Sequence, residues 1–326
     1  MMEIQEVSSL GKKITASVAT VIAGKDDVIL LAVTALFAGG HMLLDDVPGT
    51  GKTMLSKTLA KTVGGEFRRV QFTPDLLPSD LTGINYFNQK LGDFVFRRGP
   101  VFTNVLLADE INRAAPRTQS SLLECMEERQ VTVDGTTYPL ARPYFVIATQ
   151  NPVETQGTFP LPEAQLDRFL IKTSVGYPSA ESAVEILRRG AHGSPYDGVS
   201  PVCGAEEVVA AQEAVRGVYV HPDLMAYIAA LAEKTRTLPE AALGVSPRGS
   251  LALMAAAKAR AALSGRGYVV PEDIRSLARP VFAHRLIMRD SFASGGEKAA
   301  AAVEAVLAAV EVPSEKWDLP LQTVSG

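Results

Sequence analysis

The stretch DDVPGTGKT, at positions 45–53, constrains the fold more than any other part of the sequence. It follows an apolar stretch at 41–44 that predicts a buried strand, and it leads into a helix predicted over 52–63. Glycines at 49 and 51 allow the loop to turn tightly and to bring several backbone N–H groups together. A strand that enters a helix through such a loop is typical of open α/β sheets, where the loop lies at the carboxyl ends of the strands.

The elements predicted around this loop alternate between helix and strand. A buried helix is expected over 27–38, strands around 67–72, 104–108 and 144–149, and a second helix over 116–128. Short, continuous apolar strands that alternate with helices favour a parallel sheet covered by helices on both faces.

Two short hairpins interrupt this alternation. In 84–96, apolar residues alternate on both sides of the turn 88–93, and in 131–140 the pair Asp134-Gly135 joins VTV to TTYPL. Both hairpins are expected to project from the sheet as insertions.

The composition changes after the sheet-forming part of the chain. Residues 190–201 are rich in glycine, proline and serine, which predicts a linker. Alanine-rich amphipathic segments follow near 205–216, 222–235, 247–264, 271–277 and 297–310, with no strand pattern among them. We therefore predict an α/β core over 1–190, a linker over 191–201 and a small all-α domain over 202–326.

The overall composition argues against several classes of protein. The 32 basic and 36 acidic side chains give a formal charge of −4, which supplies no global field for nucleic acid or an anionic membrane. The two cysteines, Cys125 and Cys203, lie far apart and indicate neither a disulfide framework nor a metal cluster. No signal-peptide pattern and no apolar run of membrane-spanning length occurs, so we expect a cytoplasmic protein without membrane insertion.

The glycine-rich loop has the chemistry of a phosphate cradle. Its backbone N–H groups and the start of the following helix suit the phosphates of ATP, which Lys52 would reach at the β and γ positions. Thr53 would place its hydroxyl on Mg²⁺. The strict motif has a glycine where this chain has Asp46, and an ordinary strand-to-helix turn is the alternative interpretation. The residues predicted to bind the nucleotide are Pro48, Gly49, Thr50, Gly51, Lys52, Thr53 and Met54.

A second motif supplies two acids at the end of a buried strand, in the stretch VLLADE at 105–110. Asp109 would hold the Mg²⁺ shell, and Glu110 would polarise the attacking water. Alone, an acid that ends a strand is a weak signal. Together with the phosphate loop, these two acids predict an Mg²⁺-dependent ATPase.

A longer pattern carries a family resemblance. The run LLADEINRAAPRTQSSLLECMEERQVTVDG, together with ATQNPVETQGTFPLPEAQLDRF, resembles the MoxR family of AAA+ ATPases. The resemblance extends from Ile22 through SPRGSLALMAAAKARA to RPVFAHRL. It implies an AAA+ P-loop core, a parallel sheet between helix layers with two inserted β-hairpins, followed by a small all-α lid domain. In that family an acid before the valine-proline-glycine loop is common, so the resemblance explains Asp46.

The resemblance assigns roles to three further residues. Asn151 resembles the sensor that contacts the γ-phosphate or the attacking water, and the alternative is a turn asparagine. Arg168 resembles the arginine finger offered to the adjacent subunit's nucleotide, and the alternative is a salt bridge to Asp167 or Glu163. Arg248 resembles the second sensor at the start of a lid helix, acting on its own or a neighbouring subunit's nucleotide, and the alternative is an exposed arginine near a helix cap.

Four more residues are expected near the nucleotide. Ile22 and Gly24 resemble the adenine-side contacts, although such small residues also pack at helix starts. Arg113 and Gln71 are expected near the pocket, and the sequence assigns them no role.

The resemblance also implies a biological setting. It predicts a ring, as a hexamer, that acts as a remodelling motor or chaperone on client proteins. The work would be the maturation of proteins or their metal centres, together with a partner that carries a von Willebrand factor A domain. The alternatives are an AAA+ motor directed to nucleic acid, against which the acidic balance argues, and a nucleotide-gated binding module with little turnover, against which Glu110 argues.

Overall fold

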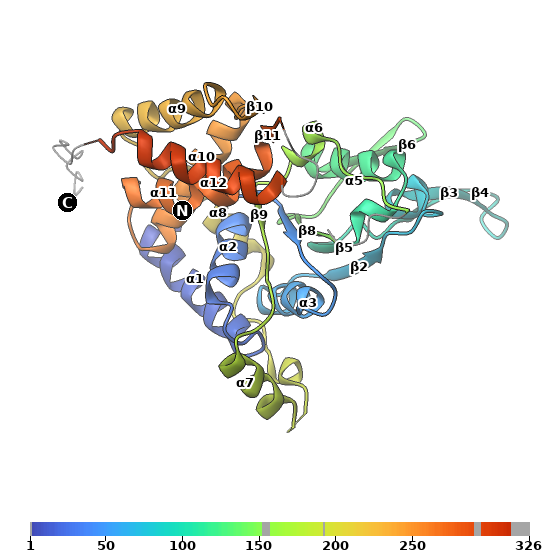
Figure 1. The fold of residues 1–326 in the computed structure, drawn as a ribbon. Helices are drawn as coiled ribbons and strands as arrows, with labels where there is room; N and C mark the ends of the chain where they lie inside the picture. Colours follow the sequence, from blue (N-terminus) through green and yellow to red (C-terminus); the bar gives the residue numbers. More distant parts are fainter. Residues whose placement is uncertain (1, 152–156, 192, 290–294, 314–326) are drawn as a thin grey trace, which may run out of the picture.

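The computed structural model of the chain describes residues 2–151, 157–191, 193–289 and 295–313. Its centre is a five-stranded sheet in the order β2-β5-β8-β1-β9, in which every neighbouring pair is parallel (Figure 1). The strands are β1 (Met42–Asp45), β2 (Phe67–Gln71), β5 (Val105–Asp109), β8 (Phe145–Gln150) and β9 (Ile171–Thr173). The four predicted strands are confirmed, with bounds that shift by at most one residue, whereas β9 was not predicted.

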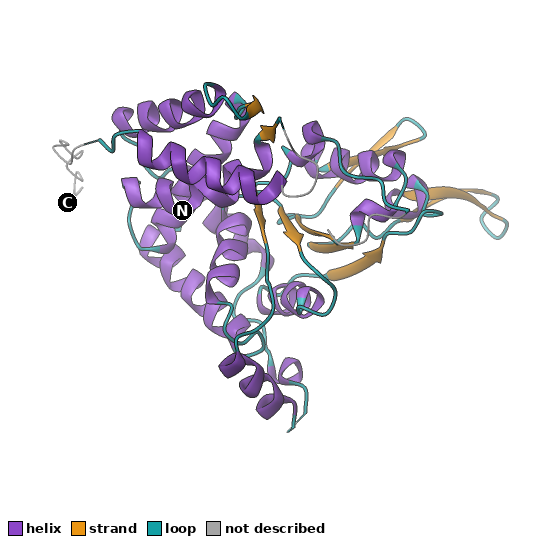
Figure 2. Ribbon diagram, viewed as in Figure 1, coloured by secondary structure: helices purple, strands orange, loops and turns teal. Residues whose placement is uncertain are grey.

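Helices cover both faces of this sheet because its central strands, β1, β5 and β8, are buried on both sides (Figure 2). Met42 and Leu44 of β1 pack in the cluster that contains α1 (Ile4–Ala19), α2 (Asp26–Phe37) and α3 (Lys52–Thr62). Leu43 points the other way, into the cluster formed with α4 (Pro78–Thr82) and α5 (Pro116–Glu128). The predicted α/β layering is therefore confirmed.

Both predicted hairpins are present. They are β3 (Gly83–Asn88) with β4 (Asp93–Arg98), and β6 (Gln130–Val133) with β7 (Thr136–Pro139). The hairpins support each other, because Asn85 donates a 2.8 Å hydrogen bond to Asp134 and Phe96 stacks on Tyr138. They project together from one end of the sheet (Figure 1).

The C-terminal part is mainly helical, as predicted. Its helices are α8 (Ala205–Arg216), α9 (Pro222–Arg236), α10 (Pro247–Leu263), α11 (Pro271–Phe282) and α12 (Gly295–Ala309). A small antiparallel pair, β10 (Ala241–Leu243) with β11 (Ile287–Met288), was not predicted. These strands are too short to show an alternating pattern, and their pairing joins segments far apart in the sequence.

One long apolar cluster joins the two parts of the chain. It runs from α1 and α2 into α8, α10 and α11, and Ser8 of α1 donates a 2.8 Å hydrogen bond to the carbonyl of Leu263. The division at 191–201 stays a prediction, and residues 314–326 of the predicted lid lie outside the described residues. No described helix is both long and apolar enough to cross a membrane.

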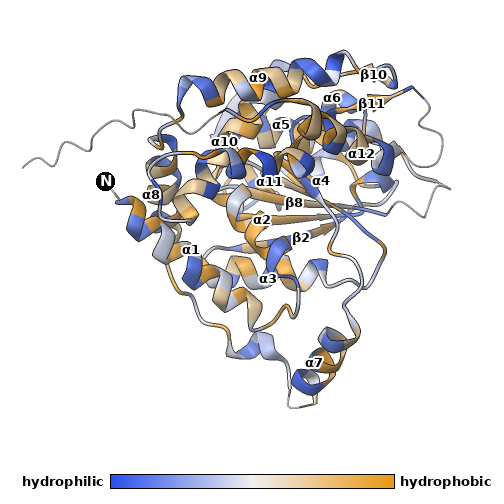
Figure 3. Cartoon of the chain, turned by 60° about the vertical axis from the view of Figure 1, so that its left-hand side comes forward, coloured by the Kyte–Doolittle hydropathy of each residue, from blue (hydrophilic) through white to orange (hydrophobic). Residues whose placement is uncertain are grey.

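Helix α7 (Ala180–Gly190) was also not predicted, and it projects from the rest of the molecule (Figure 3). It has no buried residue, and Leu187 is 73% exposed. Arg189 ties it to the core by donating hydrogen bonds to the carbonyls of Ala19 and Thr20.

Candidate active site

The phosphate loop joins β1 to α3 at the carboxyl edge of the sheet. Gly49 and Gly51 have φ values of 85° and 92°, in the left-handed region that favours glycine. The space that a Cβ would occupy at either glycine has no atom within 4 Å. The loop is therefore an open cradle that leads into the N-terminus of α3, where the backbone amides favour an anion.

Lys52 folds back over this cradle. Its ammonium donates hydrogen bonds to the carbonyls of Asp46, at 2.8 Å, and Val47, at 3.2 Å. Both acceptors are neutral, so a bound phosphate would be a stronger partner for the same charge.

Asp46 has a structural role that explains its place in the loop. Its buried carboxylate accepts hydrogen bonds from the Ser174 hydroxyl, at 2.8 Å, and from the backbone of Gly176, at 3.0 Å. The backbone N–H of Val175 donates to it as well. The acid thus fixes the start of the loop to the segment that follows β9.

The two predicted acids lie where β5 ends. Thr149 of the adjacent strand β8 donates a 2.6 Å hydrogen bond to Asp109 and accepts one at 2.8 Å from the backbone N–H of Glu110. One threonine hydroxyl therefore fixes both acids. The parallel pairing of β5 with β8 places Thr149 in this position.

Glu110 has an unusual backbone conformation and a firmly held side chain. Its φ of 56° lies in the left-handed region, which is uncommon for a residue other than glycine. One carboxylate oxygen accepts hydrogen bonds from Gln71, at 2.8 Å, and from Arg113, at 2.9 Å. Gln71 and Arg113, to which the sequence assigned no role, therefore orient the predicted base.

Arg69 belongs to the site and was missed by the sequence analysis. Its Nε and Nη2 donate hydrogen bonds of 3.0 and 2.7 Å to one oxygen of Asp109. Its Nη2 also donates to Gln71, at 2.8 Å. The signal that could have found it is strand alternation, because Arg69 lies two residues before Gln71 on the same face of β2.

These groups surround one cavity of about 390 Å³, called the phosphate-loop cavity below. Its lining brings together most of the predicted site: Pro48, Gly49, Gly51, Lys52, Thr53, Met54, Arg69, Asp109, Glu110 and Asn151. Thr50 is not part of the lining, and its hydroxyl lies 3.4 Å from the carbonyl of Val47. Asn151 is buried, and its backbone carbonyl is 3.5 Å from the side-chain amide of Asn112.

The two predicted arginines lie elsewhere. Arg168 and Arg248 are not among the residues that line the phosphate-loop cavity. Both face Glu127 of α5: Arg248 donates a hydrogen bond to its carboxylate, and Arg168 Nε is 3.9 Å from the same oxygen. The structure thus brings these two arginines together, called the arginine pair below, apart from the other site residues.

The alternative salt bridge from Arg168 to Asp167 or Glu163 is not the one observed. Asp167 is bonded instead to Arg285, at 2.6 Å, and accepts a 3.3 Å hydrogen bond from Ser246. Arg285 is almost completely buried, and burial lowers the pKa of its guanidinium. Asp167 therefore joins the core to the C-terminal helices.

The proposed adenine-side residues lie at the junction of α1 and α2, and neither lines the phosphate-loop cavity. Gly24 has a φ of 66°, and a Cβ there would come within 2.0 Å of the Ser182 hydroxyl. Gly24 is thus required for the close packing of α7. This observation fits the packing alternative for that residue.

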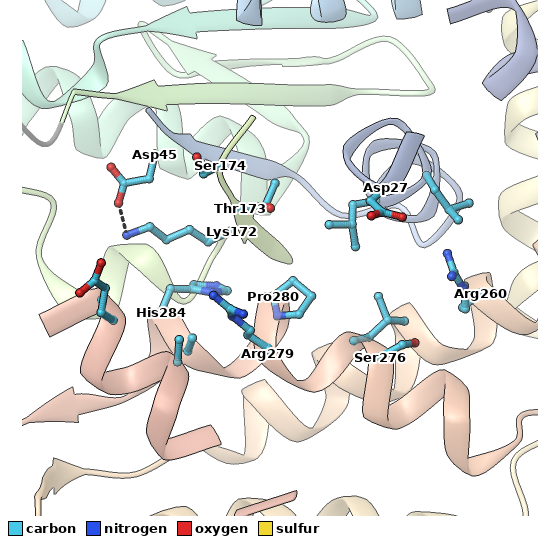
Figure 4. A pocket seen from close by; sticks show the side chains of 17 residues that line it. Asp27, Asp45, Lys172, Thr173, Ser174, Arg260, Ser276, Arg279, Pro280 and His284 are labelled. Carbon is cyan, nitrogen blue, oxygen red and sulfur yellow. Dashed lines mark ion pairs between the residues drawn. The ribbon is translucent and has the colours of Figure 1, made fainter. Parts of the chain in front are cut away.

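A larger cavity of about 980 Å³ lies between the sheet and the C-terminal helices (Figure 4). Asp45 and Lys172 form a 2.6 Å ion pair on one side of it, and Arg279 and His284 lie on the other. It shares no lining residue with the phosphate-loop cavity. We assign the chemistry to the smaller cavity, because that one contains the loop and both acids.

The residues of the phosphate-loop cavity fit a nucleotide with Mg²⁺. The open glycine cradle and Lys52 suit phosphates, and the Thr53 hydroxyl with the Asp109 carboxylate is the hard oxygen donor set that Mg²⁺ prefers. Glu110 stands beside them with its own hydrogen-bond partners.

Comparison with known proteins shows to which family the chain is related. A family model described as "ATPase family associated with various cellular activities (AAA)" matches residues 41–171, and an AAA lid domain model matches 233–306. Uncharacterized protein YeaC of Bacillus subtilis is 49% identical over 296 residues, which cover 91% of this chain and 92% of that protein. Chaperone MoxR1 of Mycobacterium tuberculosis is 42% identical over 293 residues, which cover 87% of this chain and 77% of that protein. A crystal structure described as that of a "putative ATPase" from Cytophaga hutchinsonii superposes with a TM-score of 0.87 and 39% sequence identity. The match covers 94% of this chain and 96% of that one.

Fold and site together define a P-loop protein of the AAA+ class. Within that class, the chain belongs to the MoxR family of AAA+ ATPases. The family resemblance and the predicted fold class are therefore confirmed.

Proposed function

We propose that this chain hydrolyses ATP with Mg²⁺ in the phosphate-loop cavity, and that it works as a ring. In this ring each subunit offers the arginine pair to the nucleotide of its neighbour. One observation carries the proposal: Lys52, Asp109 and Glu110 line one cavity, whereas Arg168 and Arg248 lie together outside it.

Within one subunit, the proposed division of labour follows the positions of the groups. The loop amides and Lys52 bind the phosphates, and Thr53 with Asp109 holds the metal ion, which neutralises phosphate charge when bound. Glu110 accepts a proton from the attacking water while Gln71 and Arg113 fix its carboxylate. Asn151 lies in the same cavity, where its amide suits the γ-phosphate or the water.

The arginine pair would supply positive charge to the transferring phosphoryl group, a role that Arg69 of the cavity does not fill because its guanidinium is bound to Asp109. Negative charge is spread over the transferring phosphoryl group, and an arginine finger contributes a factor of about 10³–10⁵ in related enzymes. Two guanidiniums held side by side by Glu127 form a convergent cationic surface that suits such a group. That surface lies outside its own subunit's cavity, which supports action on a neighbour.

Mixing inactive variants tests this arrangement. Glu110→Gln removes the base, and Arg168→Ala removes the finger, so each variant alone should keep at most about 1% of the wild-type rate. In a mixed ring, a subunit that keeps Glu110 can receive Arg168 from a Glu110→Gln neighbour, and ATPase activity should return in part. If the mixture stays inactive although it assembles, the ring proposal is wrong.

Concentration provides an independent test. The ATPase rate per subunit should rise with protein concentration and level off once the ring, a hexamer by the family resemblance, has formed. A constant rate from a protein shown to be monomeric by light scattering contradicts the proposal.

The proposed task is that of a chaperone acting on client proteins. One relative is named a chaperone, and the family resemblance adds a von Willebrand factor A domain partner and the maturation of clients or their metal centres. The Glu110→Gln variant, which should bind ATP without turnover, can be used as a trap. Affinity purification in ATP should retain a protein with such a domain, and retention of nucleic acid alone would favour the nucleic-acid motor.

A further inference from the structure

Arg69 places a second cation in the phosphate-loop cavity, beside Lys52. The sequence motifs assign it no role. Its guanidinium crosses from β2 to the end of β5, the strand that pairs with β2, and binds the carboxylate of Asp109. Its own side chain is 47% exposed, so the guanidinium has room to move.

Both oxygens of Asp109 have hydrogen-bond partners. One accepts the 2.6 Å hydrogen bond from Thr149, and the other accepts both hydrogen bonds from Arg69. The Asp109 side chain is only 12% exposed. Of these partners, the threonine hydroxyl is neutral and can stay when a cation binds, whereas the guanidinium carries a positive charge at the place where the metal ion is expected.

A guanidinium and a metal ion compete for such a carboxylate for two reasons. The lone pairs that accept from Arg69 are the ones that a metal ion or its water shell would use. A positive charge a few ångströms from a dication also repels it, and this repulsion is stronger in a partly buried site than in water.

We propose that Arg69 is a positioning residue that holds Asp109 in the metal-free state and must release it before Mg²⁺ binds. The proposal rests on the function proposed above, because it assigns the metal ion to Asp109. Arg69 thereby raises the Mg²⁺ concentration at which the site fills. Its displacement also removes one hydrogen bond from Gln71, the residue that holds Glu110.

The test measures how much Mg²⁺ improves nucleotide binding, which needs no turnover. The dissociation constant of the fluorescent ADP analogue mant-ADP is measured in EDTA and in saturating Mg²⁺. The constant in EDTA divided by the constant in Mg²⁺ gives the coupling between metal and nucleotide. Removing the competing cation by Arg69→Gln should raise this ratio about three- to tenfold, the range expected for a partly exposed charge pair.

The chain offers a matched control on the same strand. Arg68 points away from the cavity and pairs with Glu66 at 2.8 Å, so Arg68→Gln should leave the ratio within about twofold of the wild-type value. Arg69→Lys keeps the charge and should restore a ratio near the wild-type value.

A double-mutant cycle separates competition from a structural effect. In an Asp109→Asn background Arg69 has no carboxylate to hold, so Arg69→Gln should no longer raise the ratio. The proposal is overturned if Arg69→Gln, folded by circular dichroism, leaves the ratio unchanged or lowers it. It is also overturned if the variant raises the ratio equally with and without Asp109.

Failure of the proposed function gives a different result. In that case wild-type protein binds no mant-ADP, or Mg²⁺ does not improve binding in any variant. Failure of the Arg69 proposal alone leaves a wild-type protein that binds the analogue with Mg²⁺ and an Arg69→Gln variant that behaves in the same way.

Discussion

Arg168 and Arg248 lie against the same carboxylate, that of Glu127, although one belongs to the core and the other begins a helix of the C-terminal part. Two guanidiniums that contact the same carboxylate would repel each other if that carboxylate were absent. Glu127 therefore holds the arginine pair together in the free subunit. A phosphate of the nucleotide bound to a neighbouring subunit could take the place of this carboxylate, since phosphate and carboxylate bind the planar guanidinium group in the same way.

The arginine pair should contribute to turnover and not to nucleotide binding in its own subunit. We expect Arg168→Ala and Arg248→Ala each to lower kcat by a factor of about 10²–10³, because each removes charge stabilisation from the neighbouring site. The affinity for mant-ADP should stay within about twofold in both variants. Arg188→Ala, at an arginine that is 70% exposed and pairs with Glu185, is the control. Weakened mant-ADP binding to monomeric Arg248→Ala protein would show that Arg248 acts in its own subunit.

The amide of Gln71 should matter for the chemical step. It donates a 2.8 Å hydrogen bond to Glu110. Gln71→Ala would remove this hydrogen bond and leave the carboxylate less firmly oriented. We expect kcat to fall about tenfold with KM nearly unchanged, since the amide positions the base and does not bind the nucleotide. Steady-state ATPase kinetics provide the measurement. Gln89→Ala, in the exposed turn of the first hairpin, should behave as wild type, and an unchanged kcat for Gln71→Ala would refute this role.

The ion pair between Asp167 and Arg285 should be a major link between the core and the C-terminal helices. The Arg285 side chain is only 3% exposed, so Asp167→Ala leaves a buried charge without its acidic partner and with neutral carbonyls as acceptors. Loss of one partner of such a pair costs about 3–5 kcal/mol in the free energy of unfolding. Urea denaturation should show this loss, whereas Glu163→Ala, at an exposed neighbouring acid, should cost less than about 0.5 kcal/mol. Equal denaturation midpoints for the two variants would contradict the prediction.

The free energy of unfolding should decrease as the pH falls, partly because His41 becomes protonated. Its ring accepts a 3.0 Å hydrogen bond from the backbone N–H of Val146 and contacts the Met126 carbonyl at 3.1 Å, and burial lowers its pKa from 6.5 to about 4. The unfolded chain is therefore protonated first as the pH falls. The contribution of His41 is complete above about pH 6.5 and is lost between there and about pH 4, up to about 3 kcal/mol.

The measurement is the free energy of unfolding at several pH values, for wild type and His41→Asn. The asparagine keeps an acceptor for Val146 and has no proton to gain, so the variant should lose less stability between pH 6.5 and 4. His284 acts in the same direction, because burial lowers its pKa as well, and part of the slope should therefore remain. Identical slopes for both proteins would show that His41 is not the group responsible.

Much of the fold could be predicted because its signals are local. The strand β5 is a continuous apolar run, and helix α5 begins at Pro116, where the sequence placed its start. Helix α7 was missed because its stretch lies near the glycine-rich linker and has only a short apolar pattern. The pairing of β10 with β11 was missed because each strand is three residues or shorter.

The sequence by itself determined the centre of the site. Lys52 and Thr53 are fixed by a contiguous loop, and Asp109 and Glu110 by the end of one apolar strand, so local rules are enough to bring them to the same edge of the sheet. Only the tertiary structure decided which side chains hold these groups. Arg69 reaches Asp109 because β2 pairs with β5 in one register, and the arginine pair meets at Glu127 because the C-terminal helices pack against α5. Such contacts depend on packing between segments far apart in the chain, and no local pattern encodes them.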